Sequence, residues 1–165
     1  MEFRIEELGE FKMVGYVMST TNACMKGMED GPAFWQQMIQ EGKVGQLAQL
    51  ISRPPFGIIG ASVYNVDEQD SRKFDYYIAA ATDQPTPEGL IEYTVPAVTW
   101  AVFSCSMENL GTTQADIVTK WAPASAYEIL NQGYETGEMI SAAPDLEVYG
   151  QGTDVEIWVP VKARA

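Results

Sequence analysis

Residues 145–161 have the sequence DLEVYGQGTDVEIWVPV, and this stretch decides the fold. Its segments 145–149 and 154–161 are rich in β-branched and aromatic residues, and the turn at 150–153 between them contains two glycines. Short β-prone runs around a glycine-containing turn are typical of a hairpin. The sequence therefore predicts that the chain ends in two paired antiparallel strands.

Alternation along these two strands places a carboxylate beside an aromatic ring on each of them. Glu147 shares a face with Tyr149, and Glu156 shares a face with Trp158. Aromatic ring faces attract an organic cation by about 0.5–2 kcal/mol per contact, and a partly desolvated carboxylate adds Coulombic attraction. The same alternation is typical of a solvent-exposed strand face, so both interpretations stay open at this point.

The region before the final pair supplies the rest of a second structural unit. We expect strands at 90–95 and 97–105 after the proline-rich hinge 84–87. Thr113, with Asp116 three residues later, resembles a capping box and predicts a helix that ends near Pro123. The second half therefore has the order ββαββ.

The first half shows the same order. Alternating or apolar segments at 3–5 and 12–19 predict the first two strands. A helix is expected to open at 30–32 and to continue, with a break, to 51. Strands at about 56–66 and 73–82 complete this first unit.

Two ββαββ units predict an α+β domain with a curved antiparallel sheet, helices on one side and a ligand cleft between the halves. We expect one domain over 1–165, with pseudo-repeats at about 1–83 and 88–165. The alternative is an unrelated α+β sandwich in which the repeated order is a coincidence.

Composition narrows the possible functions. The 165 residues include 23 acidic and 10 basic side chains, a net charge of −13, and no histidine. Histidine-dependent nucleophilic, acid–base and zinc sites are therefore excluded. Nucleic-acid binding depends on clustered Lys and Arg, so no direct nucleic-acid partner is expected.

The sequence also points to a cytoplasmic protein without a bound cofactor. Cys24 and Cys105 are too few for a disulfide framework and lack metal-ligand spacing, so we expect free thiols, no metal and no cofactor. No signal-like start and no membrane-spanning apolar stretch are present, so we expect no membrane partner. We expect a monomer by default, because the sequence shows no exposed apolar stripe that a second subunit would have to bury.

Four segments in the second half, taken in order, resemble a known family. They are EYTVPAVTWAVF (92–103), WAPASAY (121–127), PDLEVY (144–149) and EIWVPV (156–161). Together they resemble the gyrase-inhibitor-like (GyrI-like) domain, which is also the effector-binding domain of Rob- and BmrR-type activators of the AraC and MerR families. The first half fits this resemblance more loosely.

The resemblance implies an SHS2-like duplicated fold that binds bulky hydrophobic or cationic molecules, as in multidrug binding, in an aromatic cleft with a buried glutamate. By motif position that glutamate is Glu147. The aromatic residues that the resemblance assigns to the cleft walls are Tyr149, Trp100, Trp121, Tyr77 and Trp35. Each of these rings has packing in the core as its alternative role.

Three functional hypotheses follow from the resemblance. The leading one is a stand-alone small-molecule-binding protein for drug or toxin sensing or sequestration, because no helix-turn-helix segment precedes the first strand. The second is a hydrolase of cyclopropane-type electrophilic toxins in which Glu147 is the general acid or base. The third is an interaction module whose partner is gyrase or a separate regulator.

Overall fold

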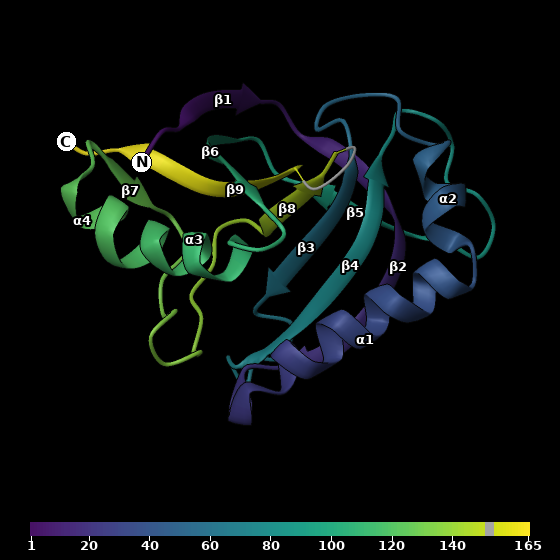
Figure 1. Cartoon of the computed structure of the whole chain (residues 1–165), viewed down its shortest axis with the longest axis horizontal. Helices are drawn as coiled ribbons and strands as arrows, with labels where there is room; N and C mark the ends of the chain where they lie inside the picture. Colours follow the sequence, from purple (N-terminus) through teal and green to yellow (C-terminus); the bar gives the residue numbers. More distant parts are fainter. Residues whose placement is uncertain (151–153) are drawn as a thin grey trace.

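Nine strands form one antiparallel sheet in residues 1–150 and 154–165, the part of the chain that the computed structural model describes (Figure 1). The strands are β1 (Arg4–Leu8), β2 (Phe11–Thr21), β3 (Ile58–Tyr64), β4 (Lys73–Ala81), β5 (Ile91–Val95), β6 (Val98–Ser106), β7 (Tyr127–Ile129), β8 (Asp145–Tyr149) and β9 (Asp154–Ala163). The predicted hairpin of β8 and β9 is present. Residues 151–153 of its turn lie outside the described residues.

The strand order β1-β6-β9-β8-β3-β4-β2-β5 reflects the duplication, with β7 paired to β9. The order is symmetric about the central pair β3 and β8 when each strand is exchanged for its counterpart in the other half. The first strand of each half pairs with the second strand of the other half, β1 with β6 and β5 with β2. This topology confirms the predicted α+β fold with duplicated units, while the boundaries of the pseudo-repeats stay a prediction.

Each half contributes helices to the same side of the sheet (Figure 1). The first half has α1 (Lys26–Gln40) and α2 (Lys43–Ala48) after a short 3₁₀ turn (Ala23–Met25). The second half has α3 (Leu110–Asp116), which continues through a π-helical turn (Ile117–Trp121) into α4 (Ala122–Ala124). None of the helices in the described residues is both long and apolar enough to cross a membrane.

The helices α1 and α3 both begin earlier in the chain than the sequence signals indicated. Pro32 lies inside α1 rather than at its start, and the carboxylate of Asp30 accepts a hydrogen bond from Thr20 Oγ1 at 2.7 Å rather than capping the helix. Thr113 lies inside α3, whose first turn is closed by the hydrogen bond from the Thr113 N–H to the Asn109 carbonyl at 2.8 Å. The predicted helix starts at 30–32 and at Thr113 were therefore wrong.

Three apolar clusters pack against the two faces of the sheet, and the two on the helix-covered face leave the middle of that face uncovered. One cluster packs α1 and α2 on the strands of the first half, and a second packs α3 on the strands of the second half. The third, on the opposite face, contains only strand residues, so the sheet packs on itself there. Between the two helix-covered clusters, the face of the central pair β3 and β8 is open to a cavity.

Candidate functional site

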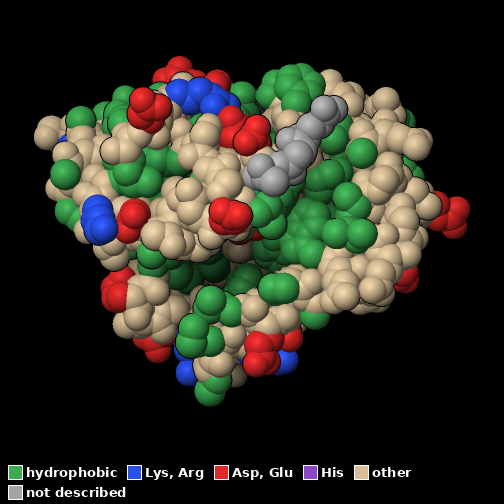
Figure 2. Space-filling model, viewed as in Figure 1, with side chains coloured by type: hydrophobic (Ala, Val, Ile, Leu, Met, Phe, Trp, Pro, Cys, Tyr) green, Lys and Arg blue, Asp and Glu red, His purple; other side chains and the backbone are tan. Residues whose placement is uncertain are grey.

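A cavity of about 1500 Å³ lies over the central strands, between α1 and α3. Figure 2 shows it as a hollow with hydrophobic side chains gathered around it. Five of the eight methionines of the chain line it, and these are Met18, Met25, Met28, Met107 and Met139. Among the described lining residues there are three acids, Glu135, Asp145 and Glu147, and no Lys or Arg.

Glu147 on β8 lies at the centre of the polar contacts in this cavity. Its Oε1 accepts hydrogen bonds from the hydroxyls of Tyr76 and Tyr149, both at 2.9 Å, and its Oε2 accepts one from Gln114 Nε2 at 2.8 Å. Trp35 Nε1 in turn donates to the Tyr76 hydroxyl at 2.8 Å. The carboxylate thus connects α1, α3 and the sheet, and all its donors are neutral.

The two tyrosines keep their protons and act as donors. Burial, followed by the nearby charge of Glu147, raises the pKa of Tyr76 well above its ordinary value. The same two causes raise the pKa of Tyr149. Both phenols are therefore neutral at physiological pH, and neither neutralises the carboxylate. Trp35 also packs edge-on against the Tyr149 ring, with centroids 4.7 Å apart.

A glycine opposite Glu147 leaves the room that this network needs. Gly60 on β3 is the register partner of Glu147, and it lies beside Tyr76. A Cβ at this position would overlap the Tyr76 hydroxyl and come within 3.0 Å of Glu147 Oε1. The absence of a side chain at Gly60 is therefore a condition of the Tyr76–Glu147 hydrogen bond.

Asp145 is a second carboxylate on the same face of β8. Its Oδ2 accepts hydrogen bonds from the hydroxyls of Tyr64 and Tyr134, both at 2.8 Å, and its Oδ1 accepts one from Asn131 Nδ2 at 3.0 Å. Burial raises the pKa of Asp145 to about 6, although these three hydrogen bonds act in the opposite direction. Asp145 therefore loses its charge in mildly acidic solution.

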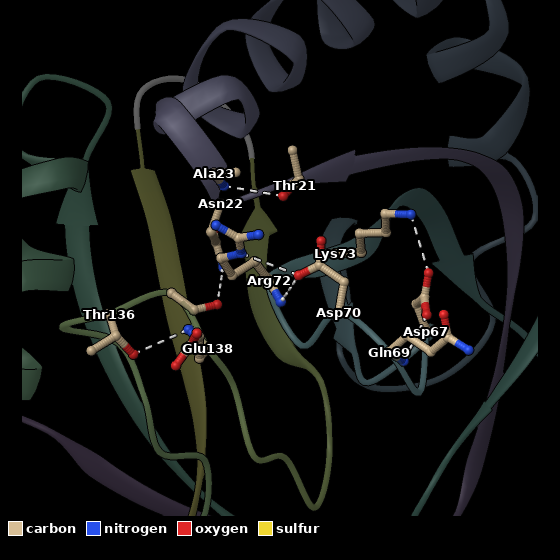
Figure 3. Close-up of polar contacts among 11 residues, drawn as sticks. Thr21, Asn22, Ala23, Asp67, Gln69, Asp70, Arg72, Lys73, Thr136 and Glu138 are labelled. Atoms are coloured by element: carbon tan, nitrogen blue, oxygen red, sulfur yellow. Dashed lines mark hydrogen bonds and ion pairs between the residues drawn. The ribbon is translucent and has the colours of Figure 1, made fainter.

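The loop 130–143, between β7 and β8, holds one side of the cavity against the first half of the chain. Asn65 donates to the Met139 carbonyl at 2.8 Å and accepts from the Ser141 N–H at 2.9 Å. Asn22 Nδ2 donates to the Gly137 carbonyl at 3.1 Å, and Figure 3 shows Asn22 pointing toward this part of the loop. The loop contributes Tyr134, Thr136 and Met139 to the cavity wall.

The second carboxylate–aromatic pair predicted from strand alternation faces away from the cavity. Trp158 Nε1 donates to Glu156 Oε1 at 3.2 Å, as the shared face implies. Arg4 closes this pair, with Nη1 at 2.6 Å from Glu156 Oε2 and its guanidinium 5.8 Å from the Trp158 ring centroid. Glu156 thus has its cation within the chain, whereas the described residues form no salt bridge to Glu147.

A comparison with protein-family models assigns the chain. The model for Cass2, described as an integron-associated effector binding protein, matches residues 4–161. The chain belongs to the Cass2 family. Effector binding is also the function of the GyrI-like domain that the sequence motifs resemble. The family match therefore confirms that resemblance.

Solved structures share the fold of this Cass2-family chain. SAV2435, solved bound to tetraphenylphosphonium, is 22% identical with a TM-score of 0.80, over 98% of this chain and 94% of that chain. A transcription-regulation protein from Staphylococcus aureus MU50 is also 22% identical, with a TM-score of 0.74, over 99% of each chain. The Vibrio cholerae integron cassette protein is 20% identical with a TM-score of 0.57, over 97% of this chain and 95% of that one. A search of curated proteins finds no match.

Three of the six residues assigned from the sequence of this Cass2-family chain come together in the cavity. Trp35, Glu147 and Tyr149 all line it and are joined by the contacts described above. Trp35 reaches it from α1, and the other two from β8. The sequence motif and strand alternation thus located the central carboxylate and one of its donors.

The other three lie outside the cavity lining. Trp100 is fully buried in the strand-only cluster, 6.0 Å from the Trp158 ring, and Tyr77 lies on that face too. Trp121 packs in the second-half cluster with its ring centroid 4.9 Å from that of Phe103. For these three rings the structure shows the packing role that the sequence left open.

Several residues of the site were not singled out from the sequence. They are Tyr76, Gln114, Asp145, Tyr64 and Tyr134. The alternation that selected Glu147 and Tyr149 also puts Asp145 on their face, so a signal for Asp145 existed. In the described part of the chain, no group of three His, Cys, Asp or Glu side chains is arranged to hold a metal ion.

Proposed function

We propose that this protein binds bulky organic cations in the cavity, with Glu147 as the anionic contact. The observation that carries the proposal is that Glu147 accepts three hydrogen bonds from neutral donors in a cavity whose described lining has no basic side chain. The donors fix the carboxylate in place, and a bound cation would supply the positive charge that the chain does not. Charges withdrawn from water are paired as a rule, and a cationic ligand is the partner that the partly buried carboxylate of Glu147 lacks.

The remaining lining supports a large and partly aromatic ligand. Trp35 and Tyr149 offer rings beside the carboxylate, where a cation gains about 0.5–2 kcal/mol per ring face. The five methionines are unbranched and polarizable, so they adapt to ligands of different shape. The similarity of fold to SAV2435, solved with tetraphenylphosphonium, supports a ligand of this class.

A pair of ions with nearly the same shape tests the charge preference. Tetraphenylphosphonium and tetraphenylborate carry opposite charges inside similar apolar shells, so apolar burial is matched between them. We expect calorimetry to give at least about 100-fold tighter binding of the phosphonium, a difference of about 2.7 kcal/mol. Equal binding of the two ions would contradict the proposal.

Two matched substitutions then test which carboxylate contacts the bound cation. Glu147→Gln should weaken tetraphenylphosphonium binding by about 10- to 100-fold, because it removes the charge and keeps the shape. Glu156→Gln is the control: it also removes a glutamate charge beside an aromatic ring, but on the other face of the sheet and next to Arg4. We expect the control to bind within about twofold of the wild type.

The Glu147→Gln variant also separates binding from turnover. A folded Glu147→Gln protein with unchanged affinity would overturn the role of this residue. Product that forms in excess over the protein, and is lost in Glu147→Gln, would replace the binding proposal by the hydrolase hypothesis.

A further inference from the structure

The cavity contains two carboxylates in closely similar settings, and the proposed function uses only one of them. Asp145, like Glu147, accepts three hydrogen bonds from neutral side chains, and the described residues provide no salt bridge to it. It lines the same cavity, together with its donors Tyr64 and Tyr134. Besides the exposed Glu135, two carboxylates of the cavity wall are therefore left without a cation among the described residues.

The spacing of the two carboxylates is set by the strand. Asp145 and Glu147 are two residues apart on β8, so they point to the same face with backbone positions about 7 Å apart. Their register partners on β3 are Ser62 and Gly60, the smallest side chains of that strand's cavity face. The space over Gly60 is filled by the Tyr76 hydroxyl, and beyond it both carboxylates line the same cavity, so one ligand can reach both.

We propose that the cavity selects organic dications whose two positive charges lie roughly 7 Å apart, one against Glu147 and the other against Asp145. This inference rests on the proposed function, because it assigns the ligand class of the same site. A monocation compensates one carboxylate and leaves the other, which is partly buried, without a cation, whereas a dication compensates both. The volume of about 1500 Å³ exceeds that of an ordinary pocket, about 300–1,000 Å³, and has room for the longer ligand.

The two carboxylates also repel each other in the empty cavity. The charge of Glu147 is among the causes that raise the pKa of Asp145, after burial. Each positive charge of a bound dication attracts both carboxylates and offsets this repulsion, whereas a neutral ligand offsets none of it. The attraction of a dication therefore includes that between each positive charge and the farther carboxylate.

A matched pair of probes measures the contribution of the second charge. Methyl viologen and 1-methyl-4-phenylpyridinium are both rod-shaped and two rings long, but the first carries two charges and the second carries one. We expect the wild type at pH 7.5 to bind methyl viologen at least about tenfold more tightly, measured directly or by displacement of tetraphenylphosphonium. In Asp145→Asn the ratio should fall to about one, while the affinity for the monocation stays within about threefold.

A pH series in the wild type tests the same inference without a substitution. The groups that face Asp145 are Tyr64 from β3, Tyr134 and Asn131 from the loop, and Glu147 from its own strand. Burial raises the pKa of Asp145 to about 6, so the group is neutral at pH 5 and charged at pH 7.5. The preference for the dication should therefore decrease severalfold between pH 7.5 and pH 5, with the monocation as internal reference.

The outcomes distinguish this inference from the proposed function. If tetraphenylphosphonium binds and methyl viologen is not preferred at pH 7.5, the dication inference is wrong and the proposed function stands. If none of these cations binds, the proposed function itself is wrong. A less stable Asp145→Asn protein with an unchanged ratio would show that Asp145 only holds Tyr64, Tyr134 and Asn131 in place, and would also overturn the inference. If that variant does not fold, the pH series decides.

Discussion

At the scale of single residues, the close packing around Gly60 gives the sharpest prediction. Gly60→Ala would push a methyl group into the Tyr76 hydroxyl, so the Tyr76–Glu147 hydrogen bond would break or the strands would shift. We expect tetraphenylphosphonium affinity to fall about tenfold and the free energy of unfolding to fall by about 1–3 kcal/mol. Calorimetry and urea denaturation measure the two effects.

Gly45 offers the matched control for this substitution. It lies on α2, is exposed, and has nothing within 4 Å of an added Cβ. Gly45→Ala should raise the free energy of unfolding by about 0.5–1 kcal/mol, because alanine is the better helix former, and should leave binding unchanged. If Gly60→Ala also behaves in this way, the close packing at the carboxylate is not what positions it.

Some residues of the site could be predicted from the sequence, and others could not. Glu147 and Tyr149 were predictable because the motif of the GyrI-like resemblance marks the glutamate, and alternation puts Tyr149 on the same face. Tyr76 and Tyr77 were not distinguishable, because β4 is buried on both faces and has no polar side to set its orientation. Trp100 has the composition of a ligand wall, yet its surroundings depend on how the sheet packs on itself.

At the scale of elements, the loop 130–143 depends on Asn65. This residue has a positive φ of 59° and makes two hydrogen bonds to the loop, so it supplies both a turn and an anchor. We expect Asn65→Gly, which keeps the turn, to cost about 1–3 kcal/mol of unfolding free energy through the lost hydrogen bonds. Asn65→Ala should cost about 1 kcal/mol more, because a Cβ disfavours this backbone conformation.

Chemical denaturation of the two variants checks this order. Because the loop carries Tyr134 and Met139, both variants should also weaken cation binding. If alanine proves as stable as glycine at this position, the left-handed backbone contributes nothing. If both variants match the wild type, the loop is held by its other contacts, such as the Met139 N–H to Ser71 carbonyl bond at 3.1 Å.

Strands were easier to predict than helix ends for a physical reason. The period-2 pattern extends over a whole strand, whereas a helix start depends on one capping group whose side chain has alternatives. Asp30 is used by Thr20, and Pro32 is tolerated within α1. The strand β7 has only three residues and carries too little pattern to be recognised.

At the scale of the whole molecule, the duplicated order of elements predicts where a cavity forms but not how large it is. Symmetry about β3 and β8 means that each half packs its helices mainly on its own strands and leaves the middle of the central pair open to the cavity. The volume depends on side chains that meet only in the folded chain, from α1, α3 and the loop 130–143. A repeat in the sequence therefore locates the site, and packing determines what fits.

The net charge of −13 and the cavity carboxylates act on cations over different distances. A change of salt concentration therefore distinguishes their two contributions to binding. Surface charges attract a cation from afar, and this attraction is screened because the Debye length falls from about 10 Å at 0.1 M salt to about 3 Å at 1 M. A contact with partly buried Glu147 is screened much less. We expect an increase from about 0.05 to about 0.5 M NaCl to weaken tetraphenylphosphonium binding only a few-fold, mainly through a slower association rate. The difference between the wild type and Glu147→Gln should persist at both salt concentrations in stopped-flow and equilibrium titrations. If high salt abolishes that difference, the cation is bound by the general acidic surface rather than by a carboxylate within the cavity.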